Sequence, residues 1–567
     1  MPTEKKLTGY PSIDKPWLKY YTEEAINAKL PECTIYEYLW ENNKDNLDEI
    51  ALIYFGKEIT YRELFENIEK TAKAFVSIGV KNEIVSVCLP SVPEAIYTIY
   101  ALNKIGAVPD LLDPRTNSEG LEFFLKESKS KFLVTIDTVN EKFVAIKNKT
   151  LIQQTISVSP ANSLSVFKKV LYKLKTNTNT YDSIPWNKFV KKTSKVEFEA
   201  NNTEKDLAVI VHTGGTTGVP KGVMLSNKSI NSIAHQYKAM FDYTRGQTLL
   251  DVIPPFASYG LCTSIHMPLS LGVSVILIPK FTLETFPDLL IEHKPNYIVG
   301  VPSFLNTLLD NQKIKDFDLS FLVCAACGGD TISKSNENKL NDFFASHNSN
   351  TLVTKGYGMS EMSATAVSCF GEVNRITSVG IPMVCNNVCI VNPDTNEELT
   401  YEQLGEICIT GPGMMIGYFN NLQLTNSIIK EHADGKRWIH TGDLGHISND
   451  GFLYHNGRIK RMIVRYDGFK IYPEAIEKIL SNHSDVSNCA IIKHEKAGLG
   501  TLPLAYIVKS ENAKNSEENI KIELFKVCKN NLPERAVPEN FIFIDKMPLT
   551  PIGKVDYRAL EKEAEKL

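Results

Sequence analysis

A loop rich in glycine and threonine, placed directly after a short apolar run, constrains this chain more than any other feature. Residues 207–211 read Leu-Ala-Val-Ile-Val, and residues 213–222 read Thr-Gly-Gly-Thr-Thr-Gly-Val-Pro-Lys-Gly. The apolar run predicts a buried strand. The glycines let a polyphosphate approach the backbone, while threonine hydroxyls and the Lys221 ammonium supply donors and positive charge. The sequence therefore predicts a strand that opens into a loop around a nucleoside triphosphate.

This loop does not follow the Walker pattern of P-loop enzymes. In that pattern two glycines flank four residues, and Lys-Ser or Lys-Thr follows at once. Here Pro220 precedes Lys221 and Gly222 follows it, which argues against a kinase-like enzyme or a P-loop ATPase. For the loop taken alone, the alternative is a flexible surface turn that carries glycine and threonine.

Length and charge narrow the class of protein. The 567 residues exceed the roughly 250–300 at which a single core stops growing, so we expect two or more domains. The formal net charge of −4 gives no reason to expect nucleic acid as a partner. No apolar run approaches the ~18 residues of a membrane span, and the N-terminal residues lack the apolar core of a signal peptide. We expect a cytoplasmic protein without a transmembrane segment.

Apolar runs of strand length alternate with longer segments of helical period. Examples of the runs are residues 133–136, 273–278 and 297–301. This alternation predicts an α/β architecture with largely buried sheets. The 11 cysteines lie mostly in apolar company and are interpreted as reduced, buried thiols. Residues 324–327, Cys-Ala-Ala-Cys, have the spacing of a redox motif or half a zinc site, but their apolar context favours a buried strand.

The chain carries five motifs, in order: the loop at 213–222, Gly-Tyr-Gly-Met-Ser-Glu at 356–361, Thr-Gly-Asp at 441–443, Gly-Arg at 457–458 and Pro-Ile-Gly-Lys at 551–554. Together they resemble the adenylate-forming superfamily of acyl-CoA synthetases, nonribosomal peptide adenylation domains and luciferases, and the chain is most like an acyl-CoA synthetase. The resemblance extends over nearly the whole chain.

The resemblance implies a particular domain organisation. A large N-terminal domain with several subdomains and mixed sheets, residues 1–458, should bind ATP and the acyl group. A small, mobile α+β C-terminal domain, residues 459–567, should carry the catalytic lysine and swing about Lys460 as the hinge. Between Arg458 and Gly468 this chain is one residue longer than most relatives, at the place where the pantetheine of CoA would thread.

The resemblance also implies the roles of individual residues. Lys221 should act on the β- and γ-phosphates, Glu361 should hold Mg²⁺, which favours hard oxygen ligands, and Lys554 should reach the acyl carboxylate and the α-phosphate. Asp443 should receive the ribose hydroxyls. The full set expected to bind ATP and CoA is Thr213, Gly214, Gly215, Thr216, Thr217, Gly218, Gly328, Gly329, Asp330, Tyr357, Gly358, Ser360, Asp443, Arg458, Gly468 and Lys470.

The expected acyl pocket is lined by Phe256, Ala257 and Tyr259. Many acyl and aryl ligases carry His where Ala257 stands, and α-amino-acid adenylation domains carry an Asp that pairs with the substrate ammonium. Ala257 can do neither, and a buried ammonium without a carboxylate partner is costly. The pocket is therefore expected to take an uncharged acyl or aryl carboxylic acid.

The implied reaction has two steps. A carboxylate and ATP give acyl-AMP and pyrophosphate, and acyl-AMP and a thiol, expected to be CoA, then give a thioester and AMP. The expected cofactors are ATP, Mg²⁺ and CoA. One alternative is a stand-alone ligase that loads a carboxylic or amino acid onto a phosphopantetheinyl carrier protein. Another is a catalytically silent nucleotide-binding protein on the same fold.

A lysine-rich segment at residues 165–195 has no counterpart in these motifs. Such a run is interpreted as a solvated face. The alternative is an amphipathic basic helix that docks an acidic carrier protein or an anionic membrane.

Overall fold

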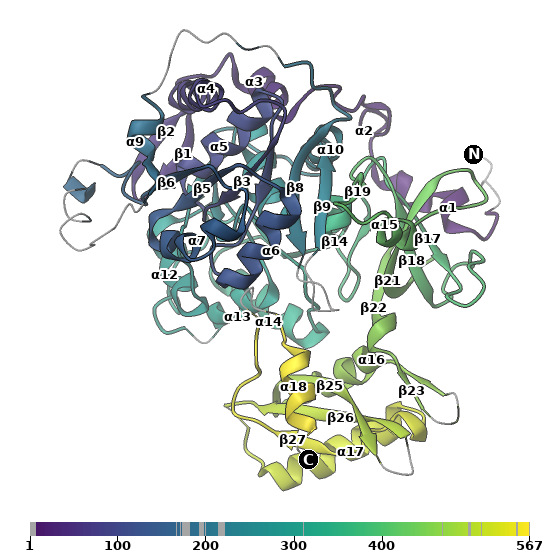
Figure 1. Ribbon diagram of the computed structural model, residues 1–567. Coiled ribbons are helices and arrows are strands. Elements are labelled where there is room, and N and C mark those ends of the chain that lie inside the picture. Colours follow the sequence, from purple (N-terminus) through teal and green to yellow (C-terminus); the bar gives the residue numbers. More distant parts are fainter. Residues whose placement is uncertain are drawn as a thin grey trace.

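The computed structural model describes residues 7–165, 167–169, 172, 182–191, 198, 200–213, 221–309, 311–465, 467, 469–496, 500–511, 513–550 and 554–565. A large body and a smaller one are visible in Figure 1, and the C-terminal end lies in the smaller body. The chain enters the smaller body after β22 (Leu453–Arg458), through the 3-10 turn η7 (Ile459–Arg461).

Two large sheets build most of the large body. The first runs in the order β16 (Ile381–Pro382), β15 (Ala364–Ser368), β14 (Val353–Met359), β13 (Cys324–Gly328), β12 (Tyr297–Gly300), β10 (Thr248–Asp251), β11 (Ser274–Leu277), β1 (Ile50–Tyr54) and β2 (Lys57–Thr60). The second runs in the order β19 (Gly417–Tyr418), β9 (Lys221–Ser226), β8 (Leu207–Thr213), β4 (Val108–Leu111), β3 (Ile84–Cys88), β5 (Phe132–Ile136), β6 (Gln154–Val158) and β7 (Ile184–Pro185). In both sheets the central strands are parallel. The first sheet has antiparallel pairs at both ends, and the second has them at the β19–β9–β8 end, whereas its other outer pair, β6–β7, is parallel.

A third sheet completes the large body, and all of its strand pairs are antiparallel. It runs in the order β17 (Asn387–Val391), β18 (Gly405–Thr410), β21 (Arg437–Ile447) and β20 (Ile429–Glu431), and β22 also pairs with β21. The smaller body holds a two-stranded sheet, β23 (Ile463–Val464) and β24 (Lys470–Ile471), and a three-stranded sheet, β25 (Val486–Lys496), β26 (Gly500–Lys509) and β27 (Phe541–Phe543).

Helices cover the sheets. In the large body they are α1 (Pro11–Asp14), α2 (Glu23–Asn27), α3 (Ile35–Asn43), α4 (Tyr61–Ser77), α5 (Pro93–Lys104), α6 (Ser118–Ser128), α7 (Asn140–Val144), α9 (Trp186–Phe189), α10 (Asn227–Met240), α11 (Met267–Ser270), α12 (Phe286–His293), α13 (Pro302–Leu309), α14 (Lys334–Ser346) and α15 (Leu422–Ile428). The smaller body has α16 (Pro473–Leu480), α17 (Glu517–Asn531) and α18 (Tyr557–Ala564). Short 3-10 turns are η1 (Pro16–Tyr20), η2 (Asp137–Val139), η3 (Lys147–Lys149), η5 (Leu283–Thr285), η6 (Ser360–Met362) and η8 (Glu534–Ala536), and η4 (Gly260–His266) is a π-helix.

Local sequence explains how these helices begin and pack. Helix α4 starts at Thr60, whose hydroxyl accepts from the Glu63 backbone N–H while the Glu63 carboxylate accepts from the Thr60 N–H. This reciprocal pair satisfies two donors that a helix start leaves open. Helix α5 begins with Pro93, whose fixed φ suits the first turn, and every residue as far as Asn103 is buried. Such a helix belongs in a core, and its side chains share one apolar cluster with strands of both large sheets.

The structure confirms the fold expected from the sequence, an α/β chain with mixed sheets and a smaller α+β body. The three apolar runs named above form β5, β11 and β12, and residues 324–327 lie within β13. Cys262, Cys408 and Cys489 are buried free thiols, as their apolar company predicts.

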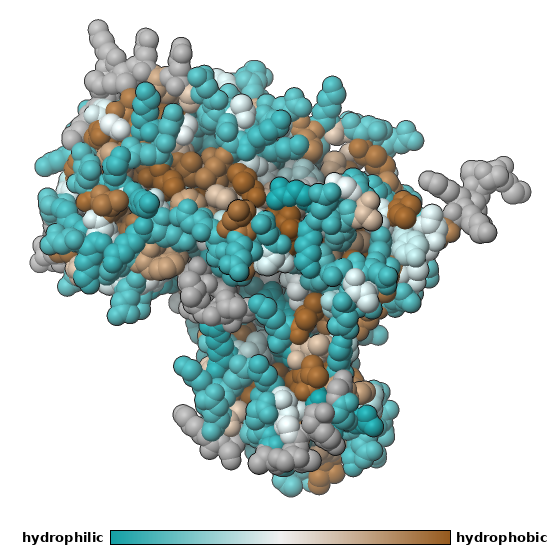
Figure 2. Space-filling view, turned by 45° about the vertical axis from the view of Figure 1, so that its right-hand side comes forward, coloured by the Kyte–Doolittle hydropathy of each residue, from teal (hydrophilic) through white to brown (hydrophobic). Residues whose placement is uncertain are grey.

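The surface agrees with a chain in which 23% of residues are charged. Hydrophilic side chains cover most of the face in Figure 2, and apolar side chains form smaller patches between them. No helix within the described ranges is both long and apolar enough to span a bilayer. Much of the lysine-rich segment lies outside the described residues, so its interpretation stays a prediction.

Candidate active site

The predicted phosphate loop joins two antiparallel strands. Strand β8 ends at Thr213 and β9 begins at Lys221, and these two residues are direct partners in the ladder. Gly214, Gly215, Thr216, Thr217 and Gly218 fall outside the described residues, so only the two ends of the loop are located. Thr213 ends β8 and Lys221 begins β9, and the two residues are paired. A hydroxyl and an ammonium therefore lie at the two ends of the loop.

Glu361 lies close to that edge, directly after β14. It is buried within η6, and the Tyr418 hydroxyl donates to its Oε1 at 2.6 Å. Tyr418 belongs to β19, which pairs with β9, and the Lys221 ammonium lies 5.1 Å from the centre of the same ring. Burial, reinforced by the Glu361 carboxylate, raises the pKa of Tyr418, so the hydroxyl remains a donor. The predicted magnesium ligand and the predicted phosphate lysine are thus joined through Tyr418, which no sequence motif indicates.

A second group of side chains surrounds Asp443 on β21. The Tyr357 hydroxyl donates to Asp443 Oδ2 at 2.7 Å, and Arg458 Nε forms an ion pair with Oδ1 at 3.0 Å. Arg458 is the direct partner of Asp443 across the β21–β22 ladder. The His455 ring, 3.9 Å from Oδ1 and beside the Tyr357 ring, completes the group. His455 lies three residues before Arg458, and no sequence motif indicates it.

The electrostatics of this group favour an ionised acceptor. Burial alone would raise the pKa of Asp443, but His455, Arg458 and Tyr357 together lower it. Asp443 Oδ1 is buried, and its 3.0 Å contact with Arg458 Nε is an ion pair without good hydrogen-bond geometry. A buried, ionised carboxylate oxygen with accepting capacity left fits a ligand hydroxyl such as one from a ribose.

Lys554 reaches this group from the smaller body. A Cβ added to Gly329 would lie 3.4 Å from Lys554 Cε and 3.5 Å from Nζ, so the lysine lies along the Gly329 backbone. Gly329 has φ of +77°, a conformation that suits glycine. Burial lowers the pKa of Lys554, and the carboxylates of Asp330 and Asp443 oppose that shift. The structure therefore brings the predicted catalytic lysine to the turn at residues 328–330 and within the field of Asp443.

The predicted acyl segment lies between these groups. Its Ser258 hydroxyl donates to Ser360 Oγ at 2.9 Å, and the Tyr259 hydroxyl donates to the Gly300 carbonyl at 3.3 Å. A Cβ on Gly328 would lie 3.5 Å from the Tyr259 hydroxyl oxygen. Ala257 is half-buried and precedes Ser258 and Tyr259, three positions before the π-helix η4, a rare element that occurs often at functional sites.

Phe256, Gly358 and Lys470 also belong to the predicted site. The first two pack against other residues of the large body, and the third lies away from the Asp443 group. Phe256 lies 5.5 Å from the Arg115 guanidinium, and Gly358 packs so closely on the Ala364 carbonyl that a Cβ would lie 1.8 Å away. Lys470 is not brought to the residues around Asp443: it forms an ion pair at 3.1 Å with Asp394, on the turn after β17.

The predicted CoA-binding loop and hinge are only partly located. Gly468 lies outside the described residues. Lys460 is exposed in η7, between the two bodies.

The neighbour of Lys460 is firmly attached to the smaller body. Arg461 donates to Glu474 and Glu477, each at 2.6 Å, and to the Ile491 carbonyl at 3.0 Å. Its guanidinium also lies 3.7 Å from the centre of the Tyr557 ring. These contacts attach Arg461 to the smaller body, directly after the predicted hinge.

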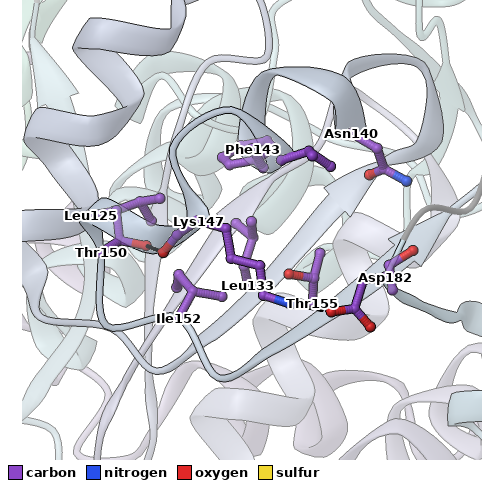
Figure 3. A pocket seen from close by; sticks show the side chains of 11 residues that line it. Leu125, Leu133, Asn140, Phe143, Lys147, Thr150, Ile152, Thr155 and Asp182 are labelled. Carbon is purple, nitrogen blue, oxygen red and sulfur yellow. Dashed lines mark hydrogen bonds and ion pairs between the residues drawn. The ribbon is translucent and has the colours of Figure 1, made fainter.

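A separate cavity of about 140 Å³ lies elsewhere in the large body. Figure 3 shows its apolar lining, including Leu125, Leu133 and Phe143, with Lys147 and Asp182 among the lining residues. These two charged side chains form an ion pair. The cavity shares no lining residue with the predicted site, so it is not the predicted acyl pocket.

Known proteins are similar to this chain over most of its length. A family model for the AMP-binding enzyme matches residues 39–419, and a model for the AMP-binding enzyme C-terminal domain matches residues 475–554. A long-chain-fatty-acid–CoA ligase of Bacillus subtilis (strain 168) is 29% identical over 97% of this chain and 98% of its own. A 4-coumarate–CoA ligase 1 of Arabidopsis thaliana is 26% identical over 94% of each chain.

Solved structures show the same fold. ATP-bound MatB from Rhodopseudomonas palustris superposes with a TM-score of 0.80 at 22% identity, covering 94% of this chain and 99% of its own. The anthranilate CoA ligase AuaEII in complex with anthranoyl-AMP gives a TM-score of 0.80 at 17% identity, covering 95% and 98%. Because the main family model spans more than half of the residues, this chain belongs to the AMP-binding enzyme family.

Proposed function

We propose that this enzyme is an AMP-forming acid–thiol ligase. It converts a carboxylic acid, ATP and CoA into an acyl-CoA thioester, AMP and pyrophosphate. The observation that carries the proposal is the convergence of Lys554, from the smaller body, on the turn at Gly329 and on the Asp443 group. A lysine brought to that place by a separate body is suited to act on a substrate held by the large body.

The first half-reaction joins two anions, so the site must neutralise charge at the α-phosphate and hold the leaving pyrophosphate. Lys554 supplies positive charge at the reacting carboxylate, and Lys221 supplies it at the departing phosphates. Glu361 is the residue that would hold Mg²⁺, which when bound would neutralise further phosphate charge. Asp443 receives the ribose hydroxyls, and Arg458 fixes that carboxylate from the neighbouring strand. The retention of all these groups favours an enzyme over a silent nucleotide-binding protein.

The second half-reaction uses the other face of the small domain. In this proposal residues 1–458 form the large domain and residues 459–567 the small one. Rotation about Lys460 withdraws Lys554 and presents the loop at Gly468 and Lys470 to the acyl-AMP. The thiol sulfur then forms a bond to the acyl carbon while the bond to AMP breaks. The hold of Arg461 on the small domain supports a pivot at Lys460.

The substrate class follows from the acyl segment. Ala257 offers neither a carboxylate nor an imidazole, so the pocket suits an acid whose tail is uncharged. The relatives named above act on long-chain fatty acids and on 4-coumarate, both of which have uncharged tails. An acyl or aryl acid as substrate and a cytoplasmic location are part of this proposal.

The test is exchange of labelled pyrophosphate into ATP, measured with fatty acids, cinnamic and benzoic acids, and α-amino acids. We expect exchange with acids of the uncharged classes and little with amino acids. The preferred acid is then offered with free CoA or with a phosphopantetheinyl carrier protein, and we expect a thioester with free CoA. Absence of exchange with every acid would contradict the adenylation step, and thioester formation on the carrier alone would contradict CoA as the acceptor.

A further inference from the structure

Two cysteines and two histidines gather on the third sheet, outside the site described above. Cys389 lies on β17, Cys408 on β18 and His440 on β21, and His432 follows β20 directly. Cys408 is the direct partner of Cys389 on one side and of His440 on the other. Directly opposed residues in antiparallel strands share a face of the sheet, so these three side chains form one row.

The potential ligand atoms of this cluster are close together. Those of Cys408, His432 and His440 all lie within 4.8 Å of one another, and the two Nε2 atoms are 3.0 Å apart. Cys408 is fully buried and His440 is 6% exposed. A zinc ion bound about 2.0–2.3 Å from nitrogen and sulfur ligands fits a triangle of this size.

The orientation of the two imidazoles is the more specific observation. His440 turns its Nδ1 to Glu406 Oε2 at 2.9 Å, and His432 turns its Nδ1 toward Cys389 Sγ at 4.0 Å. Because the His440 Nδ1 faces a carboxylate acceptor, its Nε2 directs a lone pair at the His432 Nε2 3.0 Å away, and a cation or a proton must lie between the two nitrogens. A carboxylate behind a histidine in this way is the usual support of a metal-binding imidazole.

The surroundings hold His432 in this orientation. Its ring stacks on Trp438, with centroids 5.2 Å apart and planes at 13°. The Trp438 indole N–H donates to Asp434 at 3.1 Å, which fixes the stacking partner. Two imidazoles and a thiol are therefore preorganised around one point.

We propose that Cys408, His432 and His440 bind a zinc ion through one sulfur and two Nε2 atoms, with the fourth position left for water. Nitrogen and thiolate ligands select zinc over Mg²⁺ and Ca²⁺, which take oxygen ligands. Within the described part of the chain one other group has metal-ligand spacing, formed by His483, Asp485 and Glu523, and it lacks a thiol.

The site has a structural role that its neighbours indicate. Glu406, which accepts from His440, also accepts from the Gly442 backbone N–H at 2.9 Å through its other oxygen. Gly442 precedes Asp443, the proposed ribose acceptor, within β21. A zinc ion that fixes His440 therefore also stiffens this part of β21 through Glu406.

Metal analysis tests the proposal directly. The full-length protein is loaded with zinc, passed through gel filtration with a weak chelator, and measured by mass spectrometry for metal content. We expect one zinc per chain, lost in Cys408→Ser and His440→Gln. Cys489→Ser is the matched control, because Cys489 is also a buried free thiol but lies outside the cluster, and it should retain zinc. Cobalt in place of zinc should give a tetrahedral spectrum with a thiolate charge-transfer band that Cys408→Ser removes.

Two milder variants keep the test decisive if the buried changes impair folding. His432→Gln alters a half-buried ligand on a turn and should lose zinc while the far-ultraviolet circular dichroism is unchanged. Glu406→Gln should weaken zinc affinity about 10- to 100-fold, as loss of a support behind a ligand does. A folded wild-type chain that retains no zinc, or a His432→Gln chain with unchanged affinity, would overturn the proposal and leave a simple imidazole–imidazole hydrogen bond.

Discussion

Replacing Lys554 by alanine tests the assignment of the two half-reactions most sharply. The lysine lies along the Gly329 backbone and within the field of Asp443, whereas Lys470 of the same small body is held by Asp394. The two lysines therefore have separate surroundings. We expect Lys554→Ala to impair acyl-AMP formation and to spare thioester formation from synthetic acyl-AMP.

The size of the effect follows from the charge that is removed. Two unit charges about 4 Å apart interact by about 4 kcal/mol at an effective dielectric constant of about 20, a value suited to a half-buried lysine near the surface. Each ~1.4 kcal/mol of transition-state stabilisation is a factor of ten in rate. Loss of the ammonium should therefore slow adenylation about 1,000-fold.

Pyrophosphate exchange measures adenylation, and release of AMP from synthetic acyl-AMP in the presence of CoA measures the second step. Lys562→Ala is the matched control, since it removes an exposed lysine from α18 of the same body. It should leave both rates unchanged. Equal slowing of both half-reactions by Lys554→Ala, with thermal stability unchanged, would refute the assignment of the two half-reactions to two different faces of the small domain.

Three further predictions concern the hinge, the pocket and pH. Lys460→Pro fixes φ and removes an N–H at the proposed pivot, so it should trap the observed arrangement of the two bodies. Thioester formation should then slow more than pyrophosphate exchange. Wild-type rates in both assays would exclude Lys460 as the pivot. Ala257→Trp should reduce the chain length of the longest acid that the enzyme accepts, because overpacking costs about 1–3 kcal/mol, or roughly 5- to 150-fold in specificity. An unchanged chain-length profile would show that Ala257 does not line the pocket. The lowered pKa of Lys554 means that its charge is lost as pH rises through a value below the ordinary 10.5, so adenylation should fall there. Lys554→Arg should move that fall to higher pH, and a profile unchanged by the substitution would assign it to another group.

Local sequence predicted the parts of the site that depend on neighbouring residues. The apolar run before the loop forms β8 because its residues are buried in a sheet, and Glu361 follows β14 in a tight turn. The departure from the Walker pattern also has a structural counterpart, since the described chain resumes in an antiparallel strand at Lys221. Periodicity and turn chemistry suffice for such features.

The contacts that connect distant segments were beyond this reasoning. Tyr418 reaches Glu361 only because β19 pairs with β9, and His455 approaches Asp443 only because β22 pairs with β21. Neither residue belongs to a motif. The cluster at Cys408 and His440 depends on the register of two strands, which the residue pattern alone does not specify.

If the small domain moves as proposed, the position of Arg458 makes nucleotide binding and domain orientation thermodynamically interdependent. Its side chain pairs with Asp443 in the large body, while its backbone N–H donates to Glu474 of the smaller body at 3.3 Å. A nucleotide whose contacts with Arg458 differ between two orientations must shift their populations, and each orientation must alter the affinity for that nucleotide by the same factor. A difference of about 1.4 kcal/mol would change the ratio tenfold. In the proposed two-step reaction, replacement of ATP by AMP at Arg458 would therefore shift the balance between the two orientations.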